Sequence, residues 1–268
     1  MRHWPLALLG LIWTINGQCS GGAYLFDAAG CLACHTGEGG APLAGGRRFD
    51  TPYGVYYSPN ISRDPETGIG NWSKAQFIRA LKHGEAPDGS AYFPTFPYPS
   101  YRLLHDDDAG ALFDHLMTLK PQQQENREHE LPWWLARWMM GPWQWFLLDE
   151  PGPPPADPVL RRGRYLVDAL GHCGECHTPR NALMITDASR AMAGGPHPRG
   201  EGTVPGLLDM QGRGRYSDVP DLVLALQFGE TFGYDRLSSG GMADVQMNLA
   251  KLPEDDLRAI AEYLLSLE

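Results

Sequence analysis

The chain of 268 residues contains no stretch of about 18 consecutive apolar residues, roughly the minimum for a helix that crosses a bilayer. It is also poor in positive charge, because 22 Lys and Arg stand against 32 Asp and Glu and the formal net charge is -10. The first absence excludes a membrane protein with several spans. The second disfavours nucleic acid and anionic lipid as partners of the chain as a whole.

Cysteine is scarce as well, and its five copies are too few for a disulfide scaffold and odd in number. Gly and Pro are instead abundant, at 32 and 23 residues, and both disfavour the interior of helices and strands. The hydrophobic content of 43% and the charged content of 20% are those of a folded globular protein. The composition therefore predicts a loop-rich protein with one large domain or two smaller ones.

Residues 1–19 have the form of a secretory signal peptide. A basic start is followed by an apolar run over residues 5–15, and small polar residues close the segment. The run is too short to span a bilayer, so a cleaved signal is favoured over an N-terminal anchor helix. Cys19 stands where a lipid-modified cysteine would, although Gln18 before it is larger than such processing prefers. We expect a protein exported to an oxidising compartment, the periplasm.

The rest of the sequence repeats itself once, with a shift between the two copies that drifts from 141 to 148 residues. Four matching blocks keep their order: 22–28 with 163–169, 59–61 with 205–207, 80–85 with 225–230, and 104–119 with 252–267. Two copies at so long a period indicate a duplicated domain rather than a solenoid. Each copy opens and closes with a predicted helix. We predict a mainly α fold with long Gly- and Pro-rich loops, in which a large buried prosthetic group supplements a small apolar core.

Each copy contains one Cys-x-x-Cys-His motif, the attachment signature of c-type haem. The motif residues are Cys31, Cys34 and His35 in the first copy and Cys173, Cys176 and His177 in the second. This spacing places both thiols on one side of a helical turn, where each can form a thioether to the porphyrin while the imidazole binds the iron. Of the alternatives, a zinc site would join pairs 142 residues apart, and redox pairs or structural disulfides leave the histidines without a role. The motifs therefore predict two covalently bound haem c groups.

The opposite face of each iron needs a separate ligand, and a Met thioether there raises the reduction potential. In the second copy the candidates are Met242 and Met247, and alignment of the repeats favours Met242. The equivalent stretch of the first copy, residues 92–99, contains no Met, Cys or His. The position that aligns with Met242 lies near Phe96. An open sixth position on the first haem is therefore favoured over a donor from elsewhere in the chain, such as His83, His105 or Met117.

Pro59 and Pro205 occupy equivalent positions after the two motifs. Their carbonyl groups are candidates to accept a hydrogen bond from the second nitrogen of each ligand imidazole, a contact that orients the ring and tunes the iron. Turn formation by proline explains both residues equally well from the sequence alone.

With these motifs the chain resembles the dihaem c-type cytochromes related to the cytochrome subunits of periplasmic alcohol dehydrogenases. Besides the motifs, the likeness lies in residues 43–46, 51–54, 58–62, 67–72, 96–101 and 171–181. The resemblance implies two tandem cytochrome c domains, each with a covalent haem, that pass electrons from a periplasmic dehydrogenase toward the respiratory chain. Phe96 departs from it, since many relatives carry an axial Met before the Pro-Tyr-Pro run. The third haem unit of the alcohol dehydrogenase subunits is absent, so quinone oxidation is not carried over.

We divide the chain into a signal peptide (1–19), a first cytochrome c domain (20–120), a Trp- and Pro-rich linker (121–160) and a second cytochrome c domain (161–268). Residues 131–150 of the linker hold five of the eight Trp residues. Such clusters mark membrane interfaces and partner surfaces. We favour packing of this segment against the two domains over peripheral membrane contact, because Pro132, Arg137 and Pro142 interrupt any spanning helix.

The sequence thus favours an electron-transfer protein or subunit over a stand-alone enzyme, with a periplasmic dehydrogenase as donor and a cytochrome or oxidase as acceptor. An open first haem also allows an enzyme, such as a peroxidase or a sulfur-compound oxidase, or a gas-binding module. Against a thiosulfate dehydrogenase of dihaem type, both motifs use up the cysteines of the mature chain, so none is left as a thiolate ligand.

Overall fold

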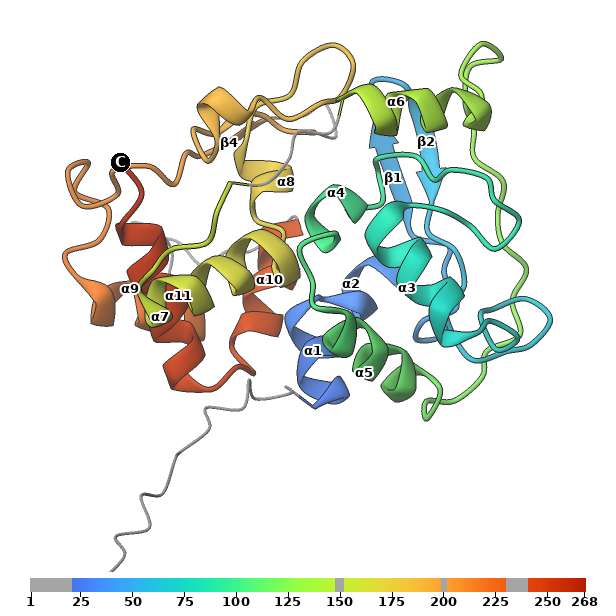
Figure 1. Cartoon of the computed structure of the whole chain (residues 1–268), viewed down its shortest axis with the longest axis horizontal. Helices are drawn as coiled ribbons and strands as arrows, with labels where there is room; N and C mark the ends of the chain where they lie inside the picture. Colours follow the sequence, from blue (N-terminus) through green and yellow to red (C-terminus); the bar gives the residue numbers. More distant parts are fainter. Residues whose placement is uncertain (1–20, 148–151, 199–201, 230–240) are drawn as a thin grey trace, which may run out of the picture.

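The computed structural model describes residues 21–147, 152–198, 202–229 and 241–268. The predicted signal peptide and Cys19 lie outside the described residues, as do residues 148–150 of the Trp-rich segment. We call the two predicted domains the first unit (20–120) and the second unit (161–268). They lie side by side, the first on the right and the second on the left of Figure 1.

The first unit is mainly helical. Its helices are α1 (Gly22–Ala28), α2 (Cys31–His35), α3 (Lys74–His83), α4 (Tyr98–Tyr101) and α5 (Asp106–Leu116), and its strands are β1 (Arg48–Thr51) and β2 (Gly54–Tyr57). The strands form an antiparallel hairpin in which Arg48 pairs with Tyr57. α5 begins with three aspartates, which offset the positive end of the helix dipole, and it packs against α1.

The linker and the second unit contain the remaining elements. They are η1 (Arg137–Met139), α6 (Met140–Leu147), α7 (Pro158–Arg164), η2 (Tyr165–Leu170), α8 (Gly174–His177), η3 (Ala188–Arg190), β3 (Gly195–Pro196), β4 (Thr203–Val204), α9 (Val219–Phe228), α10 (Gly241–Leu249) and α11 (Glu254–Leu265). α11 packs against α7 and α9, and the paired strands β3 and β4 have two residues each. The described chain is therefore mostly helical, as predicted.

The opening and closing helices of each unit meet at an equivalent glycine. A Cβ on Gly22 would lie 2.3 Å from the carbonyl oxygen of Ala111 in α5, and one on Gly163 would lie 2.0 Å from that of Ala259 in α11. Only glycine permits so close an approach. The two glycines are partners in the sequence repeat, so the repeat produces the same helix contact twice.

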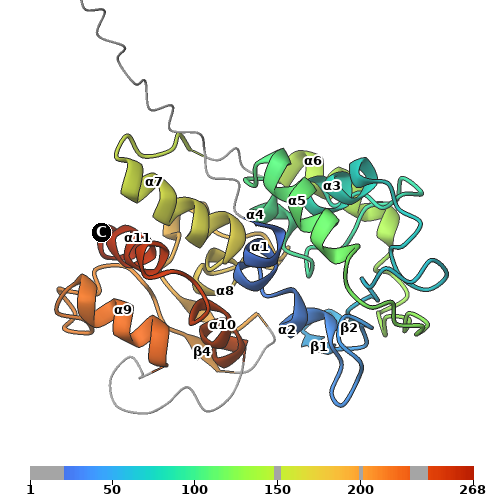
Figure 2. The ribbon, with the colours of Figure 1, turned by 90° about the horizontal axis from the view of Figure 1, so that it is seen from below.

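Two tyrosine–aspartate hydrogen bonds cross between the units. Tyr24 of α1 donates to Asp256 of α11 at 2.5 Å, and Tyr165 of η2 donates to Asp108 of α5 at 2.5 Å. Tyr24 and Tyr165 are repeat partners, and so are Asp108 and Asp256. This exchange of equivalent residues is that of a two-fold contact. It brings α1 beside α10 and η2 (Figure 2).

The helix before the second motif differs from its counterpart in the first unit. One more residue lies between Gly163 and Cys173 than between Gly22 and Cys31. The chain absorbs this residue in η2, which is a π-helix, and the N–H of Gly171 reaches back to the carbonyl of Leu166 at 2.7 Å. The helical turn before Cys173 therefore contains more residues than the turn before Cys31.

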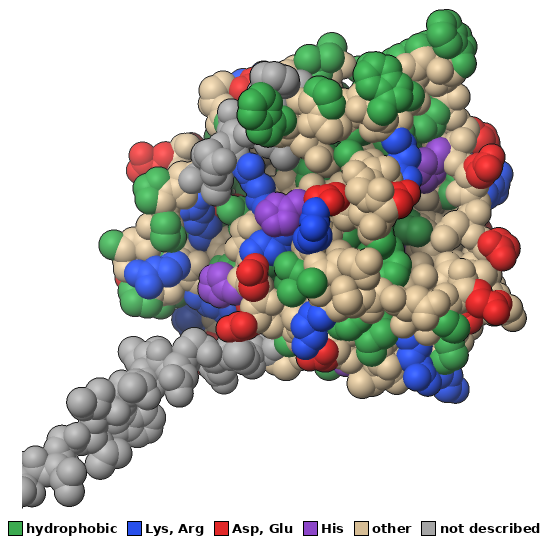
Figure 3. Space-filling model, turned by 45° about the vertical axis from the view of Figure 1, so that its right-hand side comes forward, with side chains coloured by type: hydrophobic (Ala, Val, Ile, Leu, Met, Phe, Trp, Pro, Cys, Tyr) green, Lys and Arg blue, Asp and Glu red, His purple; other side chains and the backbone are tan. Residues whose placement is uncertain are grey.

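The Trp-rich linker is packed on one side and exposed on the other. A small core joins Tyr56 and Phe93 of the first unit to linker residues Leu131, Leu135, Met139, Met140 and Trp143. By contrast, the side chains of Trp133, Trp138 and Trp145 are 95%, 77% and 81% exposed. Figure 3 shows hydrophobic side chains along the upper rim of the molecule, where α6 lies. The predicted packing thus describes one face of the segment only. Within the described ranges no helix is both long enough and apolar enough to cross a membrane.

Candidate haem-attachment sites

Both Cys-x-x-Cys-His motifs fold as short helices. The first motif forms α2, and in the second motif Cys173 directly precedes α8, which holds Cys176 and His177. A spacing of three residues places the two sulfurs of each pair on one side of a single turn. In each motif the side chain of the first cysteine is half-buried and that of the second is exposed to solvent.

A proline carbonyl holds the ring of each motif histidine. Nδ1 of His35 lies 2.9 Å from the carbonyl oxygen of Pro59, and Nδ1 of His177 lies 2.8 Å from that of Pro205. Because a carbonyl oxygen only accepts, Nδ1 carries the proton and Nε2 keeps its lone pair for a metal. The contact predicted for Pro59 and Pro205 is present in both units.

The environment keeps both imidazoles neutral. Burial lowers the pKa of His35, and the Pro59 carbonyl opposes this only in part. Burial likewise lowers the pKa of His177, which the Pro205 carbonyl raises and nearby Arg215 lowers further. Neutral imidazole is the form in which histidine binds a metal, so both rings are prepared for iron.

A second contact fixes the backbone of each histidine. The N–H of Gly45 donates to the carbonyl of His35 at 2.8 Å, and the N–H of Gly194 donates to that of His177 at 2.7 Å. Both glycines have positive φ, and a Cβ on either would collide with the loop that carries the proline. Neither glycine loop belongs to the repeat blocks found in the sequence, although Met-Ala-Gly-Gly at 192–195 matches Leu-Ala-Gly-Gly at 43–46.

The donor set of each unit fits haem c. Two thiols one helical turn apart can form the two thioethers, and a neutral imidazole with a free Nε2 can bind the iron. Across the described part of the chain, His, Cys, Asp and Glu side chains do not gather in groups of three that could hold a bare metal ion. The four cysteines therefore do not form the zinc site considered as an alternative.

Met242 and Met247 both lie on α10 but on different faces. Val245 and Leu249 of this helix pack into the hydrophobic core, and Met242 stands three and seven residues before them, on the same face. Met247 is 57% exposed. Met242 is half-buried on the core side of the helix, and its choice as the ligand stays a prediction.

Phe96 of the first unit lies in an aromatic cluster. Its ring centroid is 5.8 Å from that of Tyr92, 6.4 Å from that of Tyr98 and 5.9 Å from that of Tyr101. The ring also packs against the main hydrophobic core. At the position for which the repeat predicts a ligand, the first unit thus presents an apolar ring.

The other donors considered for the first haem are engaged elsewhere or face solvent. His83 is exposed at the end of α3. His105 stacks on Tyr165 of the second unit, with ring centroids 4.7 Å apart. Met117 closes α5 and packs against the core. Their placement leaves the prediction of an open sixth position in force.

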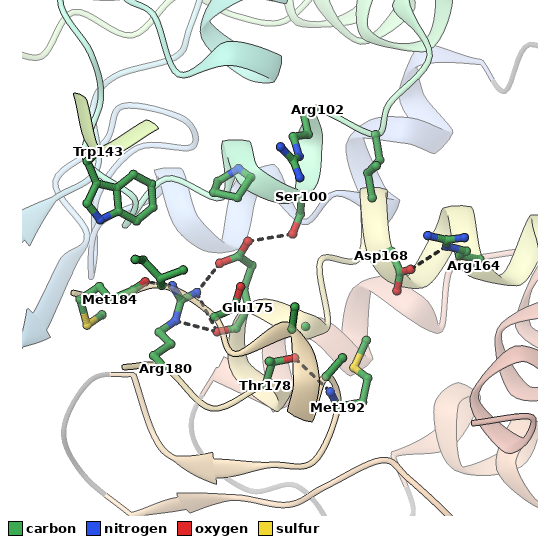
Figure 4. A pocket seen from close by; sticks show the side chains of 17 residues that line it. Ser100, Arg102, Trp143, Arg164, Asp168, Glu175, Thr178, Arg180, Met184 and Met192 are labelled. Atoms are coloured by element: carbon green, nitrogen blue, oxygen red, sulfur yellow. Dashed lines mark hydrogen bonds and ion pairs between the residues drawn. The ribbon is translucent and has the colours of Figure 1, made fainter. Parts of the chain in front are cut away.

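Glu175 ties the second motif to the first unit. The hydroxyl of Ser100 in α4 donates to its carboxylate at 2.8 Å, and Arg180 forms an ion pair with it (Figure 4). These side chains border a cavity of about 240 Å³ to which both units contribute. The two motifs are therefore held in a fixed relation by direct contacts between the units.

The family model for cytochrome c matches residues 20–120. A dihaem c-type cytochrome of Cereibacter sphaeroides is 42% identical over 262 residues, which cover 93% of this chain and 86% of that protein. The chain belongs to the dihaem cytochromes c. As a member of this family, with one attachment motif in each unit, it binds two haem c groups covalently.

Other relatives of this dihaem cytochrome c are subunits of dehydrogenases. The gluconate 2-dehydrogenase cytochrome c subunit of Pantoea cypripedii is 42% identical over 262 residues, or 92% of this chain and 58% of that subunit. The alcohol dehydrogenase (quinone) cytochrome c subunit of Gluconobacter oxydans is 38% identical over 261 residues, or 92% of this chain and 54% of that subunit. The dihaem cytochrome c thus spans little more than half of these subunits. Electron transfer with a dehydrogenase partner is the role that they support.

Proposed function

We propose that the protein is a periplasmic electron-transfer subunit with two tandem cytochrome c domains. It accepts electrons from a dehydrogenase and passes them to a cytochrome or oxidase, toward the respiratory chain. The observation that carries this proposal is the repeated geometry in which each motif histidine is held by a proline carbonyl. The dehydrogenase subunits among the relatives support the donor, and the signal-like N-terminus supports export.

Each residue of the two sites has a separate role in this proposal. The thioether positions are Cys31 and Cys34 for the first haem and Cys173 and Cys176 for the second. His35 and His177 are the proximal ligands, and Met242 is the distal ligand of the second haem. When bound, each haem supplies a one-electron couple. The chain fixes the ring orientation through the proline carbonyls and keeps Nε2 unprotonated.

Reduction by a dehydrogenase tests the proposal. The purified holoprotein is mixed with the catalytic subunit of a gluconate or alcohol dehydrogenase and its substrate, and haem reduction is followed by absorption. We expect both haems to become reduced and to be reoxidised by a cytochrome c or a terminal oxidase. Failure of every periplasmic dehydrogenase tried to reduce either haem would contradict the donor assignment.

The aromatic cluster around Phe96 favours a second candidate, chemistry with a small ligand at the first haem. An apolar pocket wall at the sixth position would admit a gas or peroxide rather than supply a protein ligand. Steady-state turnover of peroxide and thiosulfate by the purified protein tests it. Rates above those of free haem would establish an enzyme, and rates equal to them leave electron transfer as the function.

We also propose that the linker makes peripheral contact with a membrane. Residues 131–147 hold four exposed Trp side chains, of which Trp133, Trp138 and Trp145 are the most exposed. The one charged residue of this segment is Arg137, in a chain of net charge -10. Trp is enriched at the membrane interface, where its ring is apolar and its N–H remains hydrated. This face is therefore where a protein of net charge -10 can approach lipid.

Sedimentation with phospholipid vesicles tests the membrane contact. The wild-type protein should bind vesicles of phosphatidylcholine, and a variant with Trp133, Trp138 and Trp145 changed to Ser should not. The matched control changes Leu224 and Phe228, two exposed apolar residues of α9, to Ser and should bind as the wild type does. Equal binding by the Trp variant would refute the contact. If the Trp variant instead lost binding to the dehydrogenase, the exposed Trp face would be a protein-binding surface.

A further inference from the structure

His172 has a backbone conformation that is uncommon for residues other than glycine. It directly precedes Cys173, and its φ is 40°. The residue before the first cysteine of the other motif is Gly30, with a φ of 64°. Glycine takes this left-handed conformation freely, whereas a side chain strains it. The second unit therefore keeps a histidine at a position for which its own counterpart uses glycine, which indicates a role for the side chain.

The ring of His172 meets the first unit. It packs edge-to-face on Tyr101 of α4, with centroids 5.5 Å apart and planes at 90°. Tyr101 is buried, and its hydroxyl donates to the carbonyl of Ala29 at 3.4 Å. Burial lowers the pKa of His172, while Glu175 and the Ala29 carbonyl act in the opposite direction. The carbonyl of Ala29 in the first unit thus faces the rings of both Tyr101 and His172.

These contacts connect the two haem-attachment motifs by a short path. Ala29 lies two residues before Cys31, and His172 is bonded to Cys173. The path leaves Cys31 along the backbone, crosses from the Ala29 carbonyl to the rings of Tyr101 and His172, and enters Cys173 along the backbone. The π-helix η2 ends two residues before His172, so two rare backbone features occur where the path enters the second unit.

We propose that the ring of His172, packed on Tyr101 beside the Ala29 carbonyl, is the contact through which the two haem groups exchange an electron. The inference rests on the proposed electron-transfer function. The step moves one electron from the reduced haem to the oxidised haem, and no bond forms or breaks. His172 is a positioning residue, because it binds no haem itself and acts through its contact with Tyr101 and its bond to Cys173.

The variant His172→Gly separates this role from a structural one. The equivalent Gly30 shows that glycine suits the backbone at this position, so the variant should fold, bind two haems and unfold at no lower urea concentration than the wild type. The rate of haem-to-haem electron transfer after pulse reduction should nevertheless fall about tenfold. Redox titration of each variant checks that the two reduction potentials, and hence the driving force, are unchanged.

Two further variants complete the test. His172→Phe keeps a ring against Tyr101 and should recover most of the wild-type rate. His83→Gly makes the same change at an exposed histidine and should leave the rate unaltered. A wild-type rate in His172→Gly, or a rate in His172→Phe as low as in His172→Gly, would overturn the proposal. Failure of a dehydrogenase to reduce the wild-type protein would instead refute the proposed function, since pulse reduction measures the internal step without a donor.

Discussion

The two units build the same histidine support and differ in what surrounds it. Each has a glycine at the contact between opening and closing helices, a second glycine that holds the histidine carbonyl, and a proline that holds the histidine ring. The differences lie at the predicted sixth position, Phe96 against Met242, and before the first cysteine, Gly30 against His172. Repeated features therefore serve haem attachment, and unrepeated ones serve what each haem does.

The contact between the units shows the same division. The crossed bonds of Tyr24 and Tyr165 are equivalent in position, but the aspartates that accept them are not equally supported. Asp256 also receives two hydrogen bonds from Arg162, at 2.8 and 2.9 Å. Asp108 is 8% exposed and, in the described part of the chain, has Tyr165 as its one side-chain donor. We therefore expect these two equivalent bonds to contribute unequally to stability.

Loss of one cysteine pair is the change with the largest expected effect. Replacing Cys31 and Cys34 by Ala should leave one covalent haem on the chain, and replacing Cys173 and Cys176 should do the same for the other unit. Haem content by pyridine haemochrome absorption and the mass of the intact protein measure this directly. Two haems retained in either variant would show that the units do not each bind one.

Exchange of the sixth-position residues should reverse the difference between the haems. Phe96→Met introduces a thioether into the first unit and should raise the reduction potential of that haem, because a methionine ligand stabilises the ferrous state. Met242→Phe should lower the potential of the second haem by removing the thioether. Spectroelectrochemical titration measures both values. Met247→Phe is the control, and a lowered potential in this variant alone would move the ligand to Met247.

Removal of the crossed hydroxyls should cost unequal amounts of stability. Tyr165→Phe leaves the buried Asp108 carboxylate without its donor and should lower the free energy of unfolding by about 2 kcal/mol. Tyr24→Phe leaves Asp256 paired with Arg162 and should cost about 1 kcal/mol. Urea unfolding of the two variants tests this order. Equal losses would mean that the symmetry of the contact extends to its energetics.

Lowering the pH should remove a smaller contribution to stability, that of the Arg162–Asp256 ion pair. Burial raises the pKa of Asp256, but the hydrogen bonds from Arg162 and Tyr24 outweigh it and bring the pKa below its usual 3.8. A carboxyl group with a lowered pKa stabilises the fold above its unfolded-state pKa and loses this effect as the pH falls through the folded-state value. Asp256→Asn should therefore be less stable than the wild type at pH 7, and the difference should shrink below pH 3.8. A difference in urea stability that does not change with pH would refute the assignment.

The sequence predicted the parts of the site that depend on local spacing. The motifs, the helices that open and close each unit and the candidate acceptors Pro59 and Pro205 follow from residue types that recur in the same order in both copies. The match of the glycine loop at 192–195 to 43–46 was missed because its shift of 149 residues lies outside the range of 141 to 148 of the repeat blocks. A longer alignment between the repeat blocks would have found it.

The parts that the sequence did not predict depend on how the two units meet. Tyr24 and Asp256 are far apart in the chain, and nothing in their spacing indicates a bond between the units. The π-helix before His172 is the response to one extra residue, whereas the positive φ of His172 also occurs at its counterpart Gly30, where no residue is added. The exposure of Trp133 and Trp138 was not predicted either, because the composition of a Trp-rich segment does not show which of its side chains face solvent.

Carbon monoxide binding to the fully reduced wild-type protein, with haem content determined on the same sample, tests the central claim most directly. The claim is that two equally built attachment sites hold haems with different sixth positions. We expect one carbon monoxide for every two haems, bound at the first unit and abolished by Phe96→Met. Binding to neither haem or to both would contradict it.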